Sequence, residues 1–359
     1  MTTKRFCLTF ACVAVAAPAT ASATGPPEAA SSPFATGLTN PRHIRFGPDG
    51  MLYVAEAGIG GDQPATTCPP VDNMFTQDGP YLAGFSGRIS RIRPDGSRET
   101  VADRLPSSHD GLGDGFGPSD IAWIGRTMYA VIEGGGCSRG LPDDPAGIVR
   151  IGRDGSYRYV ADISTFIRAN PVANEPLCGP LRDCEPDGVP HSLLASGGLL
   201  YVVETNHNSV LRVNPHTGSI RRLYDLSVQD LAPIILTRRH GRFFLGGFDG
   251  VIQTFDHRRR PLETFDEGYG PIVDLTFARG WRLLLRLRLR ACPRRCVPSR
   301  PPTQDLRAPD PPASANPCAH VEAVHRGAPE SVLLHRGDRC VLWRRHVQPR
   351  RRFLVYGTG

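Results

Sequence analysis

Short apolar runs separated by polar, glycine-rich turns recur from residue 33 to residue 277. Five of these runs begin at a proline, and they read PRHIRFGPDGMLYVAEAG from Pro41, PSDIAWIGRTMYAVIEGG from Pro118, PHSLLASGGLLYVVETNH from Pro190, PIILTRRHGRFFLGGFDG from Pro233 and PIVDLTFARGW from Pro271. The first four each predict a strand, a tight turn and a second strand centred on an aromatic residue. A third strand, another turn and a fourth strand follow, and in the first three repeats this turn carries Pro-Asp-Gly, Arg-Asp-Gly or His-Thr-Gly.

Four strands per repeat, at a spacing of about 40 residues, are typical of a β-propeller blade. The pattern therefore predicts an all-β fold in which residues 33–277 form about four and a half propeller blades. A β-sandwich is the alternative fold. Sandwiches, however, do not repeat one motif in register along the chain.

The long insertions all interrupt the repeat at the same kind of connection. Residues 58–87 and 134–147 join a second strand to a third strand, and residues 105–117 and 164–189 join one blade to the next. In an antiparallel blade these connections lie at one end, opposite the tight turns. We therefore expect a single looped face, and we expect the binding site to lie on it.

Two sets of polar residues are expected to open onto that looped face. They are His43, Asp120, His191 and Asp274 near the starts of the innermost strands, and Glu56, Glu133 and Glu204 at the ends of the second strands. Radial repetition should bring them to the mouth of the central channel, where oxygen and imidazole groups suit Ca²⁺, Mg²⁺ or a polar ligand. The same groups could supply a general acid and a general base. The structural alternative is that they satisfy backbone groups or neighbouring arginines.

The repeat region holds four cysteines, Cys68, Cys137, Cys178 and Cys184. An even number suits disulfide bonds in an oxidising compartment, and four cysteines allow three pairings. We expect Cys178–Cys184, which closes a short local loop, and Cys68–Cys137, which joins equivalent loops of adjacent blades. A zinc site is the alternative, but the usual C-x2-C spacing is missing.

The first 23 residues have the features of an export signal. Lys4 and Arg5 precede an apolar run over residues 6–17, and Ala-Ser-Ala at residues 21–23 is a cleavage site. An uncleaved anchor is the alternative, but the apolar run of about 12 residues is shorter than the roughly 20 that span a bilayer. We therefore expect a secreted protein without a membrane span, with residues 24–32 as a linker to the blades.

Charge divides the chain into two unequal parts. Residues 1–277 carry 25 basic and 30 acidic side chains, a net charge of −5, whereas residues 278–359 carry 17 Arg and 5 acidic side chains, a net charge of +12. The overall formal charge of +7 therefore says little about the repeat region. We expect no nucleic-acid partner for the blades.

The repeat pattern fails after Phe277, where the composition changes to Arg and Pro. A disordered basic tail that binds an anionic partner is one interpretation of residues 278–359. The interpretation that we favour is an out-of-frame translation. Lys4 is the only lysine, which indicates a GC-rich gene, and GC-rich genes encode Arg and Pro when they are read out of frame. The length of this region also matches about two missing blades.

Several of the motifs quoted above resemble a known family of secreted propellers. The stretches ATGLTNPRHIRFGPDGMLYVAEAG and GLGDGFGPSDIAW, together with the export signal, resemble the ScyD/ScyE family, and NSVLRVNPHTGSI resembles six-bladed propellers of the NHL and gluconolactonase type. This resemblance covers residues 33–277 and implies an exported, six-bladed propeller with no established activity. Glu56 could match the first acidic ligand of the metal-dependent lactonases, but the matching Asn and Asp ligands are not identifiable here.

Two classes of function follow from these expectations. The first is an exported, monomeric propeller that binds a small molecule, a glycan or an extracellular protein on its looped face. The second is a metal-dependent hydrolase or lactonase that acts at the channel mouth and uses Ca²⁺ or Mg²⁺ as its cofactor. A surface interaction module without a concave site is a third possibility.

We predict that the gene, when it is read in a shifted frame after the codon for Phe277, encodes further blade repeats. Codon degeneracy permits CTA-CGT-CTC for Leu285, Arg286 and Leu287, and this sequence contains TAC-GTC, which encodes the Tyr-Val typical of a second strand in this chain. Sequencing the gene tests this prediction. If neither shifted frame restores repeats of about 40 residues, the tail is genuine.

Overall fold

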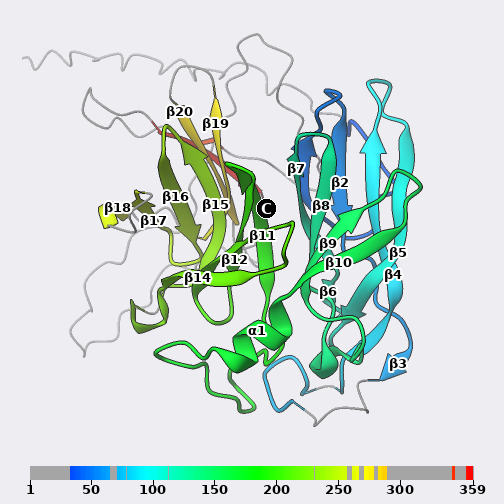
Figure 1. Cartoon of the computed structure of the whole chain (residues 1–359), viewed down its shortest axis with the longest axis vertical. Helices are drawn as coiled ribbons and strands as arrows, with labels where there is room; N and C mark the ends of the chain where they lie inside the picture. The colour runs from blue at the N-terminus through cyan, green and yellow to red at the C-terminus, as the bar shows by residue number, and fades with distance from the viewer. Residues whose placement is uncertain are drawn as a thin grey trace, which may run out of the picture.

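Five β-sheets follow one another along the chain and form the blades of a β-propeller (Figure 1). The computed structural model describes residues 33–64, 71–77, 79–111, 113–229, 231–256, 261–266, 271–278, 282–288, 342–343 and 353–358. Residues 1–32 therefore lie outside the described residues, and the export signal and the linker stay predictions.

The first four sheets have the four-stranded order that the repeats predict. Blade 1 contains β1 (Pro41–Phe46), β2 (Leu52–Glu56), β4 (Leu82–Ile92) and β5 (Arg98–His109), with the short strands β3 (Gln63–Pro64) and β6 (Gly115–Phe116) added to β4 and β5. Blade 2 contains β7 (Pro118–Ile124), β8 (Thr127–Ile132), β9 (Gly147–Ile151) and β10 (Tyr157–Asp162). Blade 3 contains β11 (Pro190–Ser196), β12 (Leu199–Glu204), β13 (Ser209–Val213) and β14 (Ile220–Asp225). Blade 4 contains β15 (Pro233–Arg239), β16 (Arg242–Gly247), β17 (Val251–Phe255) and β18 (Pro261–Asp266).

Asp-Gly pairs close the outer hairpins as the sequence indicates. Gly96 and Gly155 both have a φ of 82°, a conformation that costs glycine little. The preceding Asp95 and Asp154 each accept a hydrogen bond from the backbone N–H two residues further on. These local bonds keep the turns short.

Each blade packs against the next through its innermost strand. The strand β7 packs against β1 and β2, β11 against β7 and β8, β15 against β11 and β12, and β19 (Ile272–Ala278) against β15 and β16. Every apolar cluster between blades combines residues of two successive sheets. Examples are Ile89 with Ile121, Val131 with Leu193, Val203 with Leu236, and Ile252 with Leu275. The hydrophobic core therefore lies between the blades. Burial of each such side chain contributes about 1.5–3 kcal/mol to the stability of the fold.

The long connections gather at one end of the molecule, as expected. Figure 1 shows α1 (Ile163–Ala169), β3 and β6 together at the bottom of the view. Asp162 caps α1 by accepting a 2.8 Å hydrogen bond from the N–H of Thr165. The 3₁₀ helices η1 (Cys137–Arg139) and η2 (Ser227–Gln229) lie in two further connections. Within the described residues, no helix is long and apolar enough to cross a membrane.

The fifth sheet contains strands on both sides of Phe277. The strand β19 pairs antiparallel with β20 (Arg282–Arg288). The strands β22 (Phe353–Thr358) and β21 (Leu342–Trp343) lie next to β20 in the same sheet. The boundary at Phe277 and the out-of-frame origin of residues 278–359 stay predictions. The strand β22, however, runs parallel to β20, whereas neighbouring strands in the other four sheets are antiparallel. The fifth sheet therefore departs from the blade pattern.

A buried carboxylate joins three blades at the inner wall of the propeller. Asp120 on β7 is fully buried and accepts two hydrogen bonds from Arg45 of blade 1, at 2.9 and 2.5 Å. It also accepts bonds from the backbone N–H groups of Ile121, at 2.8 Å, and of Leu193 on β11, at 2.9 Å. Burial raises the pKa of Asp120, but Arg45 and His43 lower it below the ordinary value. The carboxylate is therefore ionised and fully used in holding blades 1, 2 and 3 together.

We predict that Asp120→Ala lowers the free energy of unfolding by about 3–5 kcal/mol, because the change leaves the Arg45 guanidinium without its buried partner. Urea denaturation of the full chain measures the loss. Glu99→Ala is the control, because the ion pairs of Glu99 with Arg91 and Arg93 are solvent-exposed and should contribute less than about 1 kcal/mol. Equal losses in the two variants would contradict the proposed role of Asp120.

Candidate functional site

Three of the predicted site residues lie close together, and they come from blades 1, 2 and 3. The rings of His43 on β1 and His191 on β11 lie edge to face, with centroids 5.3 Å apart. Glu133, which directly follows β8, places its Oε1 3.4 Å from Nδ1 of His191. Blades 1, 2 and 3 each contribute one of these side chains. Asp120 lies close by, but its oxygens are used in the inner wall.

The strand register separates Glu133 from the other two predicted carboxylates. In each blade the first residue of the innermost strand faces one residue of the second strand: Pro41 faces Glu56, Pro190 faces Glu204, and Pro118 faces Ile132. Glu133 is therefore one position further along than Glu56 and Glu204. The sequence pattern predicts three equivalent carboxylates. This equivalence is wrong for Glu133, because a shift of one residue along a strand reverses the direction of the side chain.

The same correction applies to His191. Every innermost strand has an irregular register near its start, which the sequence pattern does not reveal. Ser192 occupies the position in blade 3 that Asp120 occupies in blade 2, so His191 corresponds to Ser119. A hydrogen-bonded path connects these positions across the blades, because Ser119 accepts from His43 at 2.9 Å and donates to the carbonyl of His191 at 2.7 Å.

Glu56 and Glu204 do not take part in the channel mouth. Glu56 accepts a 2.6 Å hydrogen bond from the N–H of Thr39 and a bond from the hydroxyl of Ser90, and it lies 3.5 Å from Arg98. Both side-chain oxygens of Glu56 therefore have partners within blade 1 and the segment that enters it. This is the structural alternative that the sequence analysis left open for Glu56.

Glu204 has a similar structural role in blade 3. It accepts hydrogen bonds from the N–H of Val189 at 2.8 Å and from the N–H of His207 at 2.9 Å. The ring nitrogen Nδ1 of His207 lies 3.2 Å from the same carboxylate. Glu204 is fully buried, and it fixes the connection that enters β11.

His43 presents a buried nitrogen with no hydrogen-bond partner. Its Nδ1 donates to the carbonyl of Ser119, whereas its Nε2 is buried and has no partner among the described residues. Burial lowers the pKa of His43, and the nearby charge of Arg45 acts in the same direction. The ring is therefore neutral at pH 7, and Nε2 is an open hydrogen-bond acceptor.

Glu133 presents a second open acceptor. Its Oε1 faces His191, and its Oε2 is buried without a hydrogen-bond partner in the described part of the chain. Burial raises the pKa of Glu133, but His191, Arg42 and Arg139 together lower it to about 2. The carboxylate is therefore ionised at pH 7. His43 Nε2 and Glu133 Oε2 are thus two buried open acceptors on side chains that both neighbour His191.

The geometry does not assemble the metal site that the sequence analysis considered. Among the described residues, no three His, Cys, Asp or Glu side chains are grouped so that they could hold a metal ion. Asp120, Glu56 and Glu204 direct their oxygens at backbone amides, hydroxyls, an imidazole or arginines. A divalent ion would therefore have to rely on Glu133 and the two histidines, a set with one carboxylate only.

A buried arginine beneath the loops was not found from the sequence. Arg139 in η1 is fully buried, donates 2.9 Å hydrogen bonds to the carbonyls of Glu133 and Gly188, and pairs with Glu185 at 3.0 Å. Its guanidinium also lies 4.9 Å from the ring centroid of Phe116. Burial raises the pKa of Glu185 to about 7, although Arg139 opposes this shift. No spacing in the sequence links Arg139 to a loop about 45 residues away, since only tertiary packing joins them.

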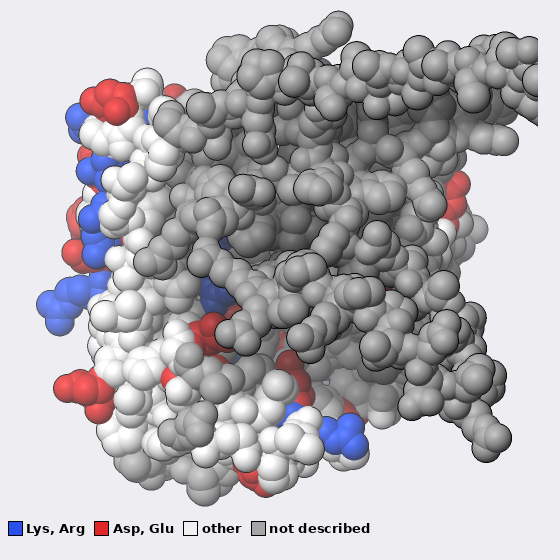
Figure 2. All heavy atoms as spheres, turned by 180° about the vertical axis from the view of Figure 1, so that it is seen from behind, with Lys and Arg blue, Asp and Glu red and all other residues white. Residues whose placement is uncertain are grey.

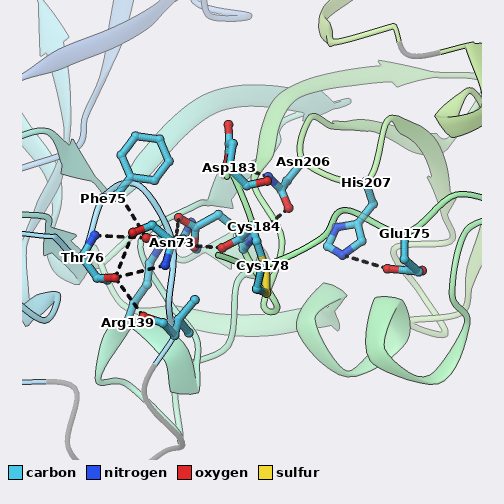
Figure 3. The surroundings of a disulfide bond; sticks show 12 residues. Asn73, Phe75, Thr76, Arg139, Glu175, Cys178, Asp183, Cys184, Asn206 and His207 are labelled. Carbon is cyan, nitrogen blue, oxygen red and sulfur yellow. Dashed lines mark hydrogen bonds and ion pairs between the residues drawn. A yellow bond between two sulfur atoms is a disulfide. The ribbon is translucent and has the colours of Figure 1, made fainter. Parts of the chain in front are cut away.

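The predicted Cys178–Cys184 disulfide is confirmed, with a Cα–Cα distance of 4.9 Å. Figure 3 shows that Asn73 reaches this bridge from the blade 1 loop, where its side chain donates a 2.8 Å hydrogen bond to the carbonyl of Cys184. Cys137 is disulfide-bonded, but Cys68 lies outside the described residues, so the Cys68–Cys137 pairing stays a prediction.

A cavity of about 330 Å³ lies beside this disulfide on the looped face. It is lined by Ile167, Arg168, Pro171, Glu175, Pro176, Cys178, Cys184, Pro186 and His207. His207 lies between two carboxylates, with Nδ1 3.2 Å from Glu204. Figure 3 shows the other contact, in which Nε2 of His207 lies 3.6 Å from Glu175. Burial lowers the pKa of His207, but Glu204 and then Glu175 raise it above 6.5, while His207 helps to lower the pKa of Glu204 despite its burial. The two groups therefore stabilise each other's charged forms.

Charges of both signs occur together on the described surface. Figure 2 shows basic and acidic side chains interspersed along one edge of the back of the molecule. Contacts of this kind join Arg91 and Arg93 to Glu99. This edge is therefore not a uniformly basic surface. The expected lack of a nucleic-acid partner stays a prediction.

The comparisons with known proteins concern the fold. No protein-family model and no curated protein sequence matches the chain. Solved propeller structures are similar to it: virginiamycin B lyase from Staphylococcus aureus (16% identity over 64% of this chain and 56% of that chain, TM-score 0.37) and BamB from Moraxella catarrhalis (12% over 68% and 52%, TM-score 0.36). A nidogen/laminin complex is also similar (15% over 63% and 79%, TM-score 0.36). The chain spans about half the length of the first two.

We predict that the contribution of His207 to stability decreases as the pH rises. The folded-state pKa of His207 is above 6.5, so the contribution is fully present below about pH 6.5 and is lost as the pH rises through the folded-state pKa. The free energy of unfolding of the wild-type protein should therefore exceed that of the His207→Gln variant by roughly 1–3 kcal/mol at about pH 5. This difference should shrink towards about pH 9. Denaturation across this range measures the difference. A difference that does not change with pH would show that the histidine is held by packing alone.

Proposed function

We propose that the protein is an exported propeller of the ScyD/ScyE type that binds a small, hydroxyl-bearing molecule at the channel mouth of its looped face. The observation that carries this proposal is the acceptor pair of His43 Nε2 and Glu133 Oε2, both buried and without hydrogen-bond partners in the described residues. Each unsatisfied buried polar group costs about 1–3 kcal/mol. A ligand whose donors reach both atoms would remove that cost.

The chemistry of the acceptor pair determines the class of ligand. Because Glu133 is ionised and His43 is neutral, the ligand must bring donors and no negative charge. His191 is partly exposed, with 17% of its side chain accessible, so the site can be reached from solvent. A neutral sugar, free or as part of a glycan, meets these requirements. A protein partner on the same face is a further candidate, but the acceptor pair is better matched to a compact polyol.

Export is supported by independent features. The Cys178–Cys184 disulfide is typical of oxidising compartments, and the N-terminal residues have the composition of an export signal. The propeller fold supports the proposed resemblance at the level of the propeller superfamily. A monomer is proposed from the sequence alone.

A second candidate function is hydrolysis at the same mouth. Glu133 and His191 form a carboxylate–imidazole dyad at 3.4 Å, the arrangement in which a carboxylate orients a histidine as a general base. A metal-dependent lactonase would need ligands other than Glu56 and Glu204, because their oxygens are already hydrogen-bonded. The dyad therefore favours a hydrolase in which His191 activates water for attack on an ester or lactone.

We predict that the full chain binds members of a panel of neutral mono- and disaccharides, and that Glu133→Gln weakens this binding about tenfold or more, because an ionised acceptor is lost. Isothermal titration calorimetry measures the affinity. Asp114→Asn is the control, since Asp114 is an exposed carboxylate on a connection at the looped face.

The same experiment separates the two candidate functions. Binding without turnover of lactone or ester probes supports the binding propeller, whereas turnover that is lost in His191→Gln supports the hydrolase. If no sugar binds and no probe is hydrolysed, or if Glu133→Gln behaves like Asp114→Asn, the proposed function is wrong.

A further inference from the structure

A second cavity, of about 460 Å³, lies at the other end of the blades. It is lined by Thr127, Tyr129, Arg150, Arg158, Tyr159, Val160, Pro215, His216, Thr217 and Gly218. Thr127 begins β8 just after the first tight turn of blade 2, and residues 215–218 form the β13–β14 turn of blade 3. The cavity is therefore a groove between blades 2 and 3 on the face with the tight turns, and it is separate from the channel mouth.

Two arginines face each other across the strands that form this groove. In the antiparallel pair β9–β10, Arg150 and Arg158 are direct register partners. On its other side Arg150 faces Tyr129 of β8. Like charges directly opposite one another destabilise a sheet. No acidic residue is among those that line the groove.

In blade 1, carboxylates of the protein neutralise the arginine at the position equivalent to Arg150. There the register partners are Tyr53, Arg91 and Glu99, in the same order across three strands. Arg91 pairs with Asp49 at 2.8 Å and with Glu99 at 3.6 Å. The arginine of blade 1 therefore has carboxylates both opposite it and in the adjacent turn.

Blade 2 lacks both of these carboxylates. Arg158 stands where blade 1 has Glu99, and the turn before β8 is shorter and contains Gly125 and Arg126 in place of the Pro-Asp-Gly that includes Asp49. Blade 2 thus keeps the Tyr-Arg pair of blade 1. The carboxylates that neutralise the arginine in blade 1 are missing, and Arg158 adds a second positive charge. An external anion would restore the charge balance.

The Tyr159 hydroxyl does not belong to this donor set. Tyr159 is the register partner of Val149 and packs in the cluster between blades 1 and 2, so its side chain lies on the other side of the sheet from Arg150 and Arg158. The groove therefore presents two guanidinium groups that no carboxylate among the lining residues balances.

We infer that this groove binds an oxyanion, a phosphate or sulfate group, either free or as an ester on a larger molecule. Guanidinium groups bind such groups through paired, charge-assisted hydrogen bonds. The facing guanidinium groups of Arg150 and Arg158 supply these donors. The inference concerns a different face from the proposed sugar site and does not depend on it.

The test compares the wild-type chain with Arg158→Glu, which recreates the Arg–Glu pair of blade 1. We expect inorganic phosphate to raise the melting temperature of the wild-type protein. We expect Arg158→Glu to melt at a higher temperature without phosphate and to bind phosphate about tenfold or more weakly, because the internal carboxylate replaces the anion. Calorimetric titration and thermal denaturation give the two readouts.

Blade 3 offers a matched control. Arg212 and Arg221 are also register partners, next to Tyr201, but neither lines the groove. Arg221→Glu should relieve the same repulsion and leave phosphate binding unchanged. If Arg221→Glu weakens phosphate binding as much as Arg158→Glu does, the effect is one of net charge and the inference is overturned.

Three probes distinguish the sources of the anion. Inorganic phosphate, a sugar phosphate and a sulfated disaccharide are titrated separately. Tighter binding of an ester probe than of inorganic phosphate assigns the groove to an esterified ligand, and the reverse assigns it to the free ion. If the wild-type protein responds to none of the three probes, there is no anion site. Glu133→Gln should leave all three affinities unchanged, so a failure here is separate from a failure at the channel mouth.

Discussion

The buried carboxylate of Asp120 is the constraint on which the arrangement of the first three blades depends. Its four hydrogen bonds reach Arg45 of blade 1, its own strand, and the backbone of blade 3 at Leu193. A buried charge needs this degree of compensation, because an ionised group without partners is costly inside a protein. Since all its lone pairs are used, Asp120 supports the channel mouth but offers nothing to a ligand. The side chains beside it remain available for chemistry.

One residue of strand register decides which carboxylates are structural and which is open. Glu56 and Glu204 face the first residues of their innermost strands and hold the segments that enter them. Glu133 lies one position later, so it meets His191 and keeps an oxygen free. A glutamate at the end of the second strand is therefore structural in blades 1 and 3 and open to a ligand in blade 2. Blades 1 and 2 differ similarly on the opposite face, where Arg158 replaces Glu99.

The propeller could be predicted from the sequence because alternation, turn glycines and repeat length are local signals, and the Cys178–Cys184 bond followed from proximity along the chain. The channel mouth could be predicted only in part. The irregular register at the start of each innermost strand depends on pairing, so the offset of Glu133 was missed. Arg139 was missed because its partners come from distant loops.

We propose that His43 Nε2 and Glu133 Oε2 both accept hydrogen bonds from a ligand of the looped face. A crystal structure of the full chain, grown in the presence of a disaccharide, is the measurement that decides this. We expect density for a hydroxyl-bearing molecule or ordered water within about 3 Å of both atoms. Side chains or backbone groups of the protein that donate hydrogen bonds to both atoms would contradict it.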